Sequence, residues 1–294
     1  MARRLKPLGQ PTRGKTAPNR LRKTDTFLAL AYPEFVRHMP SLYVDLGYGA
    51  YPITSVETLH RLRRLNPNLR VLGVEIDPQR VAEAVPFAEP GLEFRLGGFN
   101  LPLQPGECVS VLRAFNVLRQ YDEAEVEGAL VALSESLTEA GLIIEGTSDP
   151  LGRLLAFNVY QLGEREAGPP LSRRKSPSGE GGRGGEGLRL KRLAFVLAPT
   201  LRADFVPRQF QAVLPKNFIH HAEPGGAIDQ FFAAWHAAWH AARSQAKDLR
   251  QVFTQSALRL ANQYGYNLDR RPALLRRGFL CLGPEWPETI AATR

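Results

Sequence analysis

The sequence predicts an α/β fold, because segments with strand character alternate with helix-like segments over its first half. A strand-like run covers residues 41–46, a helix-like run follows over about 53–65, and a second strand-like run covers 70–78. At 294 residues, the chain is long enough for one large domain or for a core that carries an insertion.

The junction between the first strand and the following helix has the form of a ligand-binding turn. The strand leads through Asp45 into Gly47 and Gly49, and the second strand ends at the acid Glu75. A strand that delivers glycines to a helix start lets backbone N–H groups approach a ligand closely. Glycines alone do not indicate a ligand, because they also make ordinary tight turns. Glu75 strengthens the interpretation, because the ribose hydroxyls of a nucleoside ligand need an acidic group as hydrogen-bond acceptor.

Two segments carry a resemblance to a known family. The sequences VDLGYG at 44–49 and VLGVEIDP at 71–78 resemble the first two motifs of class I S-adenosylmethionine-dependent methyltransferases, and the resemblance extends over about residues 24–160. It implies an α/β fold with a Rossmann-like, mostly parallel seven-stranded sheet flanked by helices. A basic N-terminal extension and a helical C-terminal insertion or subdomain would be added to that sheet.

The resemblance also implies S-adenosyl-L-methionine as the cofactor and a set of residues that bind it. The first motif would surround the methionine end, the acid of the second strand would hold the ribose, and two later strand ends would meet the adenine and form the floor. The set is Asp45, Gly47, Tyr48, Gly49, Glu75, Ile76, Gly98, Phe99, Asn100, Arg113, Ala114 and Phe115. The family's usual third glycine is Tyr51 here, which implies a rebuilt loop over the cofactor.

The adenine contact has two interpretations. The side-chain oxygen of Asn100 could accept a hydrogen bond from the exocyclic amine, with Phe99 as an apolar or stacking surface. A Gly-rich turn with a core Phe explains the same residues equally well.

The acceptor side is expected after the fourth predicted strand, because open α/β sheets bind ligands at the carboxyl ends of their strands. Asn116, Arg119 and Tyr121 are the candidates for orienting the acceptor. The Asn/Asp-Pro-Pro-Tyr/Phe tetrapeptide of base-amine methylases is absent, and no Cys stands in a nucleophile position. Glu145, at the end of the fifth strand, is either a catalytic base or, in the favoured interpretation, a structural acid.

Positive charge is concentrated at the N-terminus and predicts a nucleic-acid partner. Of the net charge of +9, eight basic residues precede Asp25 without an intervening acid: Arg3, Arg4, Lys6, Arg13, Lys15, Arg20, Arg22 and Lys23. Such an arm suits phosphate backbones, so RNA is the expected partner and methyl acceptor. The alternative for the arm itself is a solvated tail.

Other functions stay open beside the RNA methyltransferase. A small-molecule methyltransferase is the second choice, and a non-catalytic cofactor- or nucleic-acid-binding protein is the third. A nicotinamide oxidoreductase is disfavoured, because Pro52 stands where the G-x-G-x-x-G fingerprint needs its third glycine.

The chain is expected to divide into four regions. They are a basic arm at 1–23, a cofactor-binding core at 24–162, a flexible loop rich in Gly, Pro, Ser and Arg at 163–187, and the rest of the sheet with a helical part at 188–294. The first ten residues have the composition of a disordered segment. Arg20 or Arg22 is expected to fold back over the site and meet the cofactor carboxylate or a substrate phosphate.

In the second half, the sequence predicts a further set of elements. It predicts a helix over about 147–160, a sixth strand at 188–197, one long helix at 227–263 and a seventh strand at 277–282. The pair Trp235 and Trp239 lies on one face of that long helix and is expected to pack in a core. His236 and His240 have metal-compatible spacing, but no acid or cysteine pair completes a site, so no metal is expected.

The remaining features indicate a soluble cytoplasmic protein. No apolar run reaches membrane-spanning length, and no apolar signal core follows the basic N-terminus. The two cysteines, Cys108 and Cys281, are interpreted as buried thiols, which suits a reducing compartment.

Overall fold

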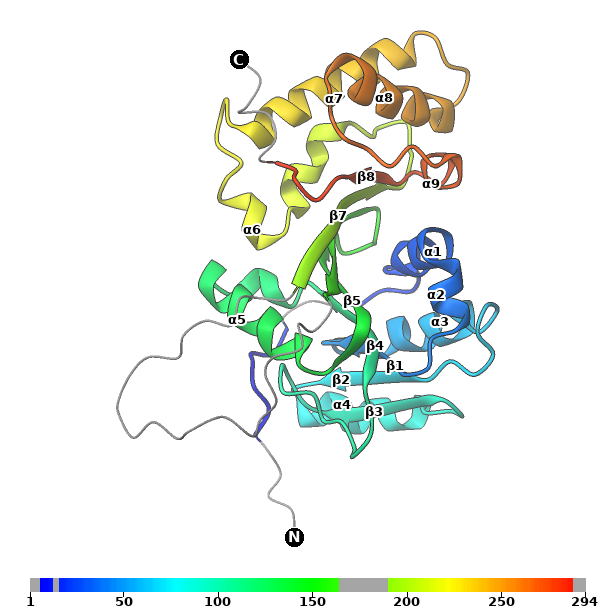
Figure 1. Cartoon of the computed structure of the whole chain (residues 1–294), viewed down its shortest axis with the longest axis vertical. Helices are drawn as coiled ribbons and strands as arrows, with labels where there is room; N and C mark the ends of the chain where they lie inside the picture. Colours follow the sequence, from blue (N-terminus) through cyan, green and yellow to red (C-terminus); the bar gives the residue numbers. More distant parts are fainter. Residues whose placement is uncertain (1–5, 13–15, 164–189, 288–294) are drawn as a thin grey trace, which may run out of the picture.

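The structure is a computed structural model of the chain and describes residues 6–12, 16–163 and 190–287. Apart from Gly163, the flexible loop expected at 163–187 lies outside the described residues. Within these residues, eight strands form one sheet in the order β3-β2-β1-β4-β5-β6-β7-β8 (Figure 1). The strands are β1 (Leu42–Leu46), β2 (Val71–Glu75), β3 (Leu92–Leu96), β4 (Val109–Phe115), β5 (Leu137–Ser148), β6 (Leu154–Leu162), β7 (Leu190–Pro199) and β8 (Leu280–Leu282).

The first five strands make a parallel sheet and confirm the predicted Rossmann-like core. β1 pairs in parallel with both β2 and β4, β2 with β3, and β4 with β5. Every residue of β1, β2 and β4 is buried, as expected for strands covered by helices on both faces. The chain order reverses between β1 and β4, and this switch point is where open α/β sheets bind their ligands.

Short helices connect and cover these strands (Figure 1). They are α1 (Arg22–Ala31), α2 (Pro33–Arg37), α3 (Ile53–Leu62), α4 (Pro78–Ala84) with the 3₁₀ turn η1 (Val85–Phe87), η2 (Leu118–Gln120) and α5 (Glu123–Ser134). The predicted helix after the glycine turn and the predicted proline-initiated helix after β2 are both present, with Asp77 accepting hydrogen bonds from Gln79 N and Arg80 N at the start of α4.

The second half of the sheet is antiparallel and corrects two predictions. β5 pairs with β6, β6 with β7 and β7 with β8, all antiparallel, so the described sheet has eight strands instead of seven. The helix predicted over 147–160 is wrong: this region contains the end of β5 and most of β6. Its short apolar run is buried on both faces of the sheet, and such a run does not distinguish a strand from a buried helix by periodicity.

The antiparallel pairing also determines which strand ends lie together. Because β6 reverses the direction of β5 and β7 reverses it again, β7 runs in the same direction as β4 and β5. Its carboxyl end at Pro199 therefore lies on the same edge of the sheet as the ends of β1 and β4.

A helical part packs on the β7–β8 end of the sheet, at the top of Figure 1. It contains η4 (Pro207–Val213), α6 (Lys216–Ile219), α7 (Ala227–Arg243), α8 (Leu249–Gln263) and α9 (Pro272–Arg276). The single long helix predicted over 227–263 is instead two helices, with the side chain of Asp248 capping the second. Trp235 and Trp239 are fully buried in the aromatic core of this part, as predicted.

The sequence predicts that both cysteines are buried, and the structure confirms this for one of them. Cys281 is buried as predicted, but Cys108 is exposed, because it lies just before β4 begins. Among the described residues, none of the helices combines the length and the apolarity needed to cross a bilayer.

Glu145 lies inside the sheet, opposite Asn158 on β6. The Asn158 side-chain amide donates to Glu145 Oε2 at 2.9 Å, and Asn158 Oδ1 has no donor among the described residues. Burial raises the pKa of Glu145 to about 7, although the hydrogen bond from Asn158 opposes the shift. A protonated Glu145 could supply the missing donor, so the geometry favours the structural interpretation of this acid.

We predict that Glu145→Gln removes a pH dependence of stability. The native pKa of about 7 exceeds the ordinary value of 4.5, so the folded state holds a proton that the unfolded chain releases, and stability falls as pH rises from 4.5 to 7. Urea denaturation should show the variant close to the parent at about pH 5 and more stable by about 2–3 kcal/mol above pH 7. Glu139→Gln, an exposed position of the same strand, is the control. Parallel pH curves for Glu145→Gln and the parent would contradict the assignment.

Candidate functional site

A buried arginine joins the two central strands to the first helix. Arg113, on β4, is fully buried; its Nε donates to Asp45 Oδ1 at 2.9 Å and its Nη2 lies 2.9 Å from Asp45 Oδ2. Its Nη1 donates to Asp25 Oδ1 on α1, also at 2.9 Å. Burial alone would lower the pKa of Arg113, but the two carboxylates outweigh it and raise the pKa, so the guanidinium stays charged.

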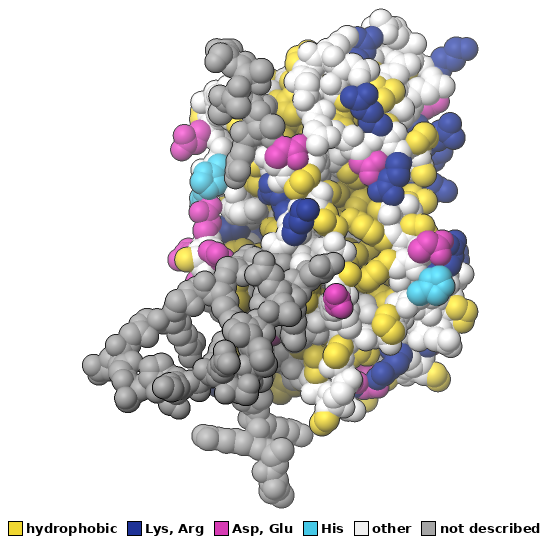
Figure 2. Space-filling model, in the orientation of Figure 1, with side chains coloured by type: hydrophobic (Ala, Val, Ile, Leu, Met, Phe, Trp, Pro, Cys, Tyr) yellow, Lys and Arg dark blue, Asp and Glu magenta, His cyan; other side chains and the backbone are white. Residues whose placement is uncertain are grey.

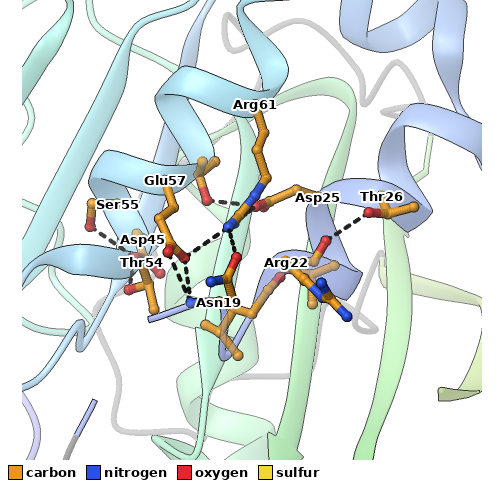
Figure 3. A network of polar contacts seen from close by, with 12 residues as sticks. Asn19, Arg22, Asp25, Thr26, Asp45, Thr54, Ser55, Glu57 and Arg61 are labelled. Carbon is orange, nitrogen blue, oxygen red and sulfur yellow. Dashed lines mark hydrogen bonds and ion pairs between the residues drawn. The ribbon is translucent and has the colours of Figure 1, made fainter. Parts of the chain in front are cut away.

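A second layer of polar side chains completes this network (Figure 3). Thr54 and Ser55, at the start of α3, each donate a hydroxyl to Asp45 Oδ2 at 2.8 Å. Arg61 donates to Asp25 Oδ2 at 3.0 Å and to Asn19 Oδ1 at 2.8 Å. Both oxygens of Asp45 are therefore engaged by protein donors, and this carboxylate ties the end of β1 to the start of α3 across the intervening glycine turn.

The glycine turn and Glu75 form the centre of the candidate site. Gly47 and Gly49 have φ values of +70° and +86°, a left-handed conformation that favours glycine. The N–H of Gly49 donates to Glu75 Oε2 at 2.9 Å, and that of Ile76 donates to Oε1 at 2.9 Å. Glu75 is thus fixed at the carboxyl end of β2, beside the switch point, where the resemblance places the ribose.

Two small cavities, each of about 20 Å³, meet at Leu46 and Gly47 on this edge. Eight of the twelve predicted cofactor residues line one or both of these cavities, and Gly49, Asn100, Arg113 and Ala114 line neither. The first is lined by residues that include Glu75, Ile76, Gly98, Phe99 and Tyr121, and the second by residues that include Asp45, Tyr48, Thr54, Phe115 and Asn116. We name the first cavity the adenosine side and the second the methionine side, after the parts of the cofactor that the sequence resemblance assigns to these residues.

The N-terminal arm lies in the adenosine side. Phe99 N donates to Leu8 O at 2.8 Å, Leu8 N donates to Asn100 Oδ1 at 2.7 Å, and Gln10 N donates to the hydroxyl of Tyr121. A Cβ atom added to Gly98 would lie 1.9 Å from Leu8 O, so the absence of a side chain there is what admits the arm. The expectation that the first ten residues lack structure is therefore wrong for residues 6–10, and residues 1–5 lie outside the described residues.

With the arm in place, the cavities of the cleft are too small for a nucleoside cofactor. Ligand pockets for small molecules and cofactors generally measure about 300–1,000 Å³, more than ten times the space beside the arm. A nucleoside cofactor therefore fits only after residues 8–12 move out of the cleft.

The candidates for orienting the acceptor occupy different places. Asn116, with φ +58°, lines the methionine side and donates from Nδ2 to Ser148 Oγ at 3.2 Å. Tyr121 lines the adenosine side instead. Arg119 is exposed, donates to Ala212 O at 2.9 Å, and lines neither cavity.

Some predicted cofactor residues lie beneath or beside the cleft. Arg113 and Ala114 are fully buried in β4 and line neither cavity, and the side chain of Asn100 is bonded to the arm. Arg20 lines the methionine side and donates from Nε to Ser148 Oγ at 3.0 Å, whereas Arg22 lines a separate cavity. The sequence did not indicate the roles of Asp25 and Arg61, which depend on contacts between distant segments.

Comparisons with known proteins give structural similarities only. No protein-family model and no curated protein matches the sequence. The similar solved structures include CalS10, an amino pentose methyltransferase from Micromonospora echinaspora, with 16% identity and a TM-score of 0.34 over 52% of this chain and 66% of that one. Another is RosA, N,N-8-amino-8-demethyl-D-riboflavin dimethyltransferase from Streptomyces davawensis, with 20% identity and a TM-score of 0.31 over 41% of this chain and 35% of that one.

A third similar structure is the N-methyltransferase NodS from Bradyrhizobium japonicum, with 14% identity and a TM-score of 0.31 over 43% of this chain and 67% of that one. The chain thus spans less than two thirds of the first two of these proteins. All three are methyltransferases, the class that the two sequence motifs resemble. Similarities of this size do not indicate an acceptor.

We predict that Arg113→Met lowers the free energy of unfolding by about 3–5 kcal/mol, because it leaves the buried Asp45 charge without a cation and Asp25 with Arg61 as its remaining ion-pair partner. Urea denaturation followed by far-UV circular dichroism measures this change. Arg64→Met, at an exposed position after α3, should change stability by less than about 0.5 kcal/mol. A loss below about 1 kcal/mol for Arg113→Met would contradict the role given to this ion pair.

Proposed function

We propose that this chain is an S-adenosylmethionine-dependent methyltransferase that acts on RNA. One observation carries the enzyme class: Glu75 is held by the N–H groups of Gly49 and Ile76 at the switch point of a parallel sheet. Such a position suits the ribose of a nucleoside cofactor. The left-handed glycines of the same turn leave room for a close approach.

The residues at the strand ends fit S-adenosyl-L-methionine. Glu75 would accept hydrogen bonds from the ribose hydroxyls, Ile76 and Phe99 would flank the adenine, and Asn116 and Arg20 would lie at the methionine end. When bound, the cofactor supplies a methyl group on a sulfonium that is already activated for transfer. The chain therefore has to position the acceptor and exclude water, more than to activate a nucleophile.

RNA is proposed as the acceptor from the distribution of charge. Eight Lys and Arg residues precede Asp25, and the end of this segment, at Arg20, lies beside the methionine side of the cleft. Phosphate contacts supply much of the affinity of nucleic-acid-binding proteins. A polyanionic acceptor is therefore favoured over a neutral small molecule.

A second candidate is a cofactor-binding protein without transfer activity. The observation that favours it is the arm in the adenosine side, which leaves the cleft covered. A small-molecule methyltransferase stays the alternative for the acceptor, because the chain lacks the base-amine tetrapeptide.

The test measures cofactor binding and methyl transfer with Glu75→Gln. Labelled methyl from S-adenosylmethionine is offered with a cell extract that is then separated into RNA, protein and small-molecule fractions. We expect label in the RNase-sensitive fraction. Because a charge-assisted hydrogen bond contributes about 1.5–3 kcal/mol, Glu75→Gln should weaken cofactor binding by about 10- to 100-fold and reduce the transfer accordingly.

Glu83→Gln, on the exposed side of α4, is the matched control and should behave as the parent. Label in the small-molecule fraction alone would make the RNA assignment wrong. Cofactor binding without any labelled product would support the second candidate. Equal cofactor binding by Glu75→Gln and the parent would contradict the proposed site.

A further inference from the structure

A basic cavity lies apart from the cofactor cleft, between α1, the end of β7, α8 and α9. Its volume is about 400 Å³, and none of its lining residues is acidic. The lining includes five basic side chains, together with Thr26, Pro199, Thr200, Leu201 and Phe279; the basic ones are Arg22, Lys23, Arg250, Arg276 and Arg277. We call this cavity the basic pocket.

The arginines of the basic pocket are available for a ligand. Arg22, Arg250, Arg276 and Arg277 are all exposed, and among the described residues none of their guanidinium groups takes part in an ion pair. This separates them from Arg61, Arg113 and Arg271, which are paired with carboxylates. Figure 3 shows Arg22 directed away from the network around Asp25.

Lys23 adds a buried charge to the same cavity. Its ammonium donates to Pro199 O at the end of β7, and only 8% of the residue is exposed. Burial, and then the neighbouring Arg22 charge, lower the pKa of Lys23 to about 7. An anion in the pocket would offset both effects.

The basic pocket lies on the same edge of the sheet as the cofactor cleft. Pro199 ends β7 on the same edge of the sheet as the ends of β1 and β4. At the start of α1, Arg20 and Leu21 line the methionine side of the cleft, and the next two residues, Arg22 and Lys23, line the basic pocket. Figure 1 shows α1 facing α9 there, and Figure 2 shows Lys and Arg side chains along the right-hand edge of the molecule, over the helical part.

We propose that the basic pocket binds backbone phosphate of the RNA acceptor and so holds the acceptor beside the methionine end of the cofactor cleft. This inference rests on the proposed function and adds the surface that binds the acceptor. Guanidinium groups match phosphate geometry and are weakly hydrated, which makes unpaired arginines the usual partners of a nucleic-acid backbone. Four such groups around one cavity can contact adjacent phosphates of a folded strand.

The experiment measures binding of a short fluorescein-labelled RNA hairpin to the full chain, by fluorescence anisotropy without cofactor, between about 50 and 200 mM KCl. Arg250→Glu and Arg277→Glu reverse one charge each at the pocket. Arg250 lies in the first turn of α8, where an acid is compatible with the helix dipole, so this variant should keep its fold. Arg64→Glu, exposed and outside the pocket, makes the same change of charge elsewhere.

We expect each pocket variant to weaken hairpin binding by roughly tenfold. The slope of the logarithm of the binding constant against the logarithm of the KCl concentration should also decrease in magnitude by about one. Arg64→Glu should change hairpin binding by less than about twofold. Equal losses in all three variants would overturn the proposal in favour of diffuse attraction. Inorganic phosphate is added as a competitor at constant ionic strength. If phosphate occupied the pocket and the protein then showed no preference for the hairpin over free phosphate, the assignment to RNA would be wrong.

The failure of this proposal is distinguishable from that of the proposed function. Label transfer into RNA that is unchanged in both pocket variants would overturn the pocket assignment and leave the enzyme class in place. Hairpin binding that depends on Arg250 and Arg277, without any methyl transfer, would support the pocket and contradict the enzyme class.

Discussion

The buried ion pair between Arg113 and Asp45 is the interaction on which the geometry of the site depends. It joins β4 to β1 at the point where the strand order reverses. Arg113 also pairs with a second carboxylate, Asp25, and this contact joins α1 to the same two strands. A buried charge is tolerated only when it is paired and hydrogen-bonded, so these side chains specify one arrangement of strands and helices. The same network bonds Asp45 to Thr54 and Ser55 at the start of α3, and Arg113 to Asp25 on α1.

Residues 6–12 of the N-terminal arm lie against the candidate cofactor cleft. Residues 6–12 bond to the loop after β3 and to Tyr121, and they occupy space that a nucleoside cofactor needs. Binding of the proposed cofactor would therefore be coupled to release of residues 8–12, and the apparent affinity would be reduced by the fraction of molecules in which these residues are seated.

Local features of this fold were predictable, and long-range ones were not. Short segments of sequence predict the glycine turn, the acid at the end of β2 and the parallel core. In each of them, the local strand and turn residues favour the structure that the whole fold requires. The helix expected at 147–160 failed because an apolar run buried on both faces has no period that separates strand from helix. The break between α7 and α8 was missed although Asp248 caps the second helix. Arg113 finds its carboxylates 68 and 88 residues away, and no local pattern indicates such partners.

The most direct test of this account is amide hydrogen exchange of the full chain with and without saturating S-adenosylhomocysteine. In the free protein, the N–H groups of Leu8, Gln10 and Phe99 are bonded between the arm and the cleft. We expect the ligand to accelerate exchange at Leu8 and Gln10, because it would displace the arm, while Gly49 and Ile76 stay protected at the proposed ribose site. Slower or unchanged exchange at Leu8 and Gln10 in the bound protein would contradict the displacement of the arm by the cofactor.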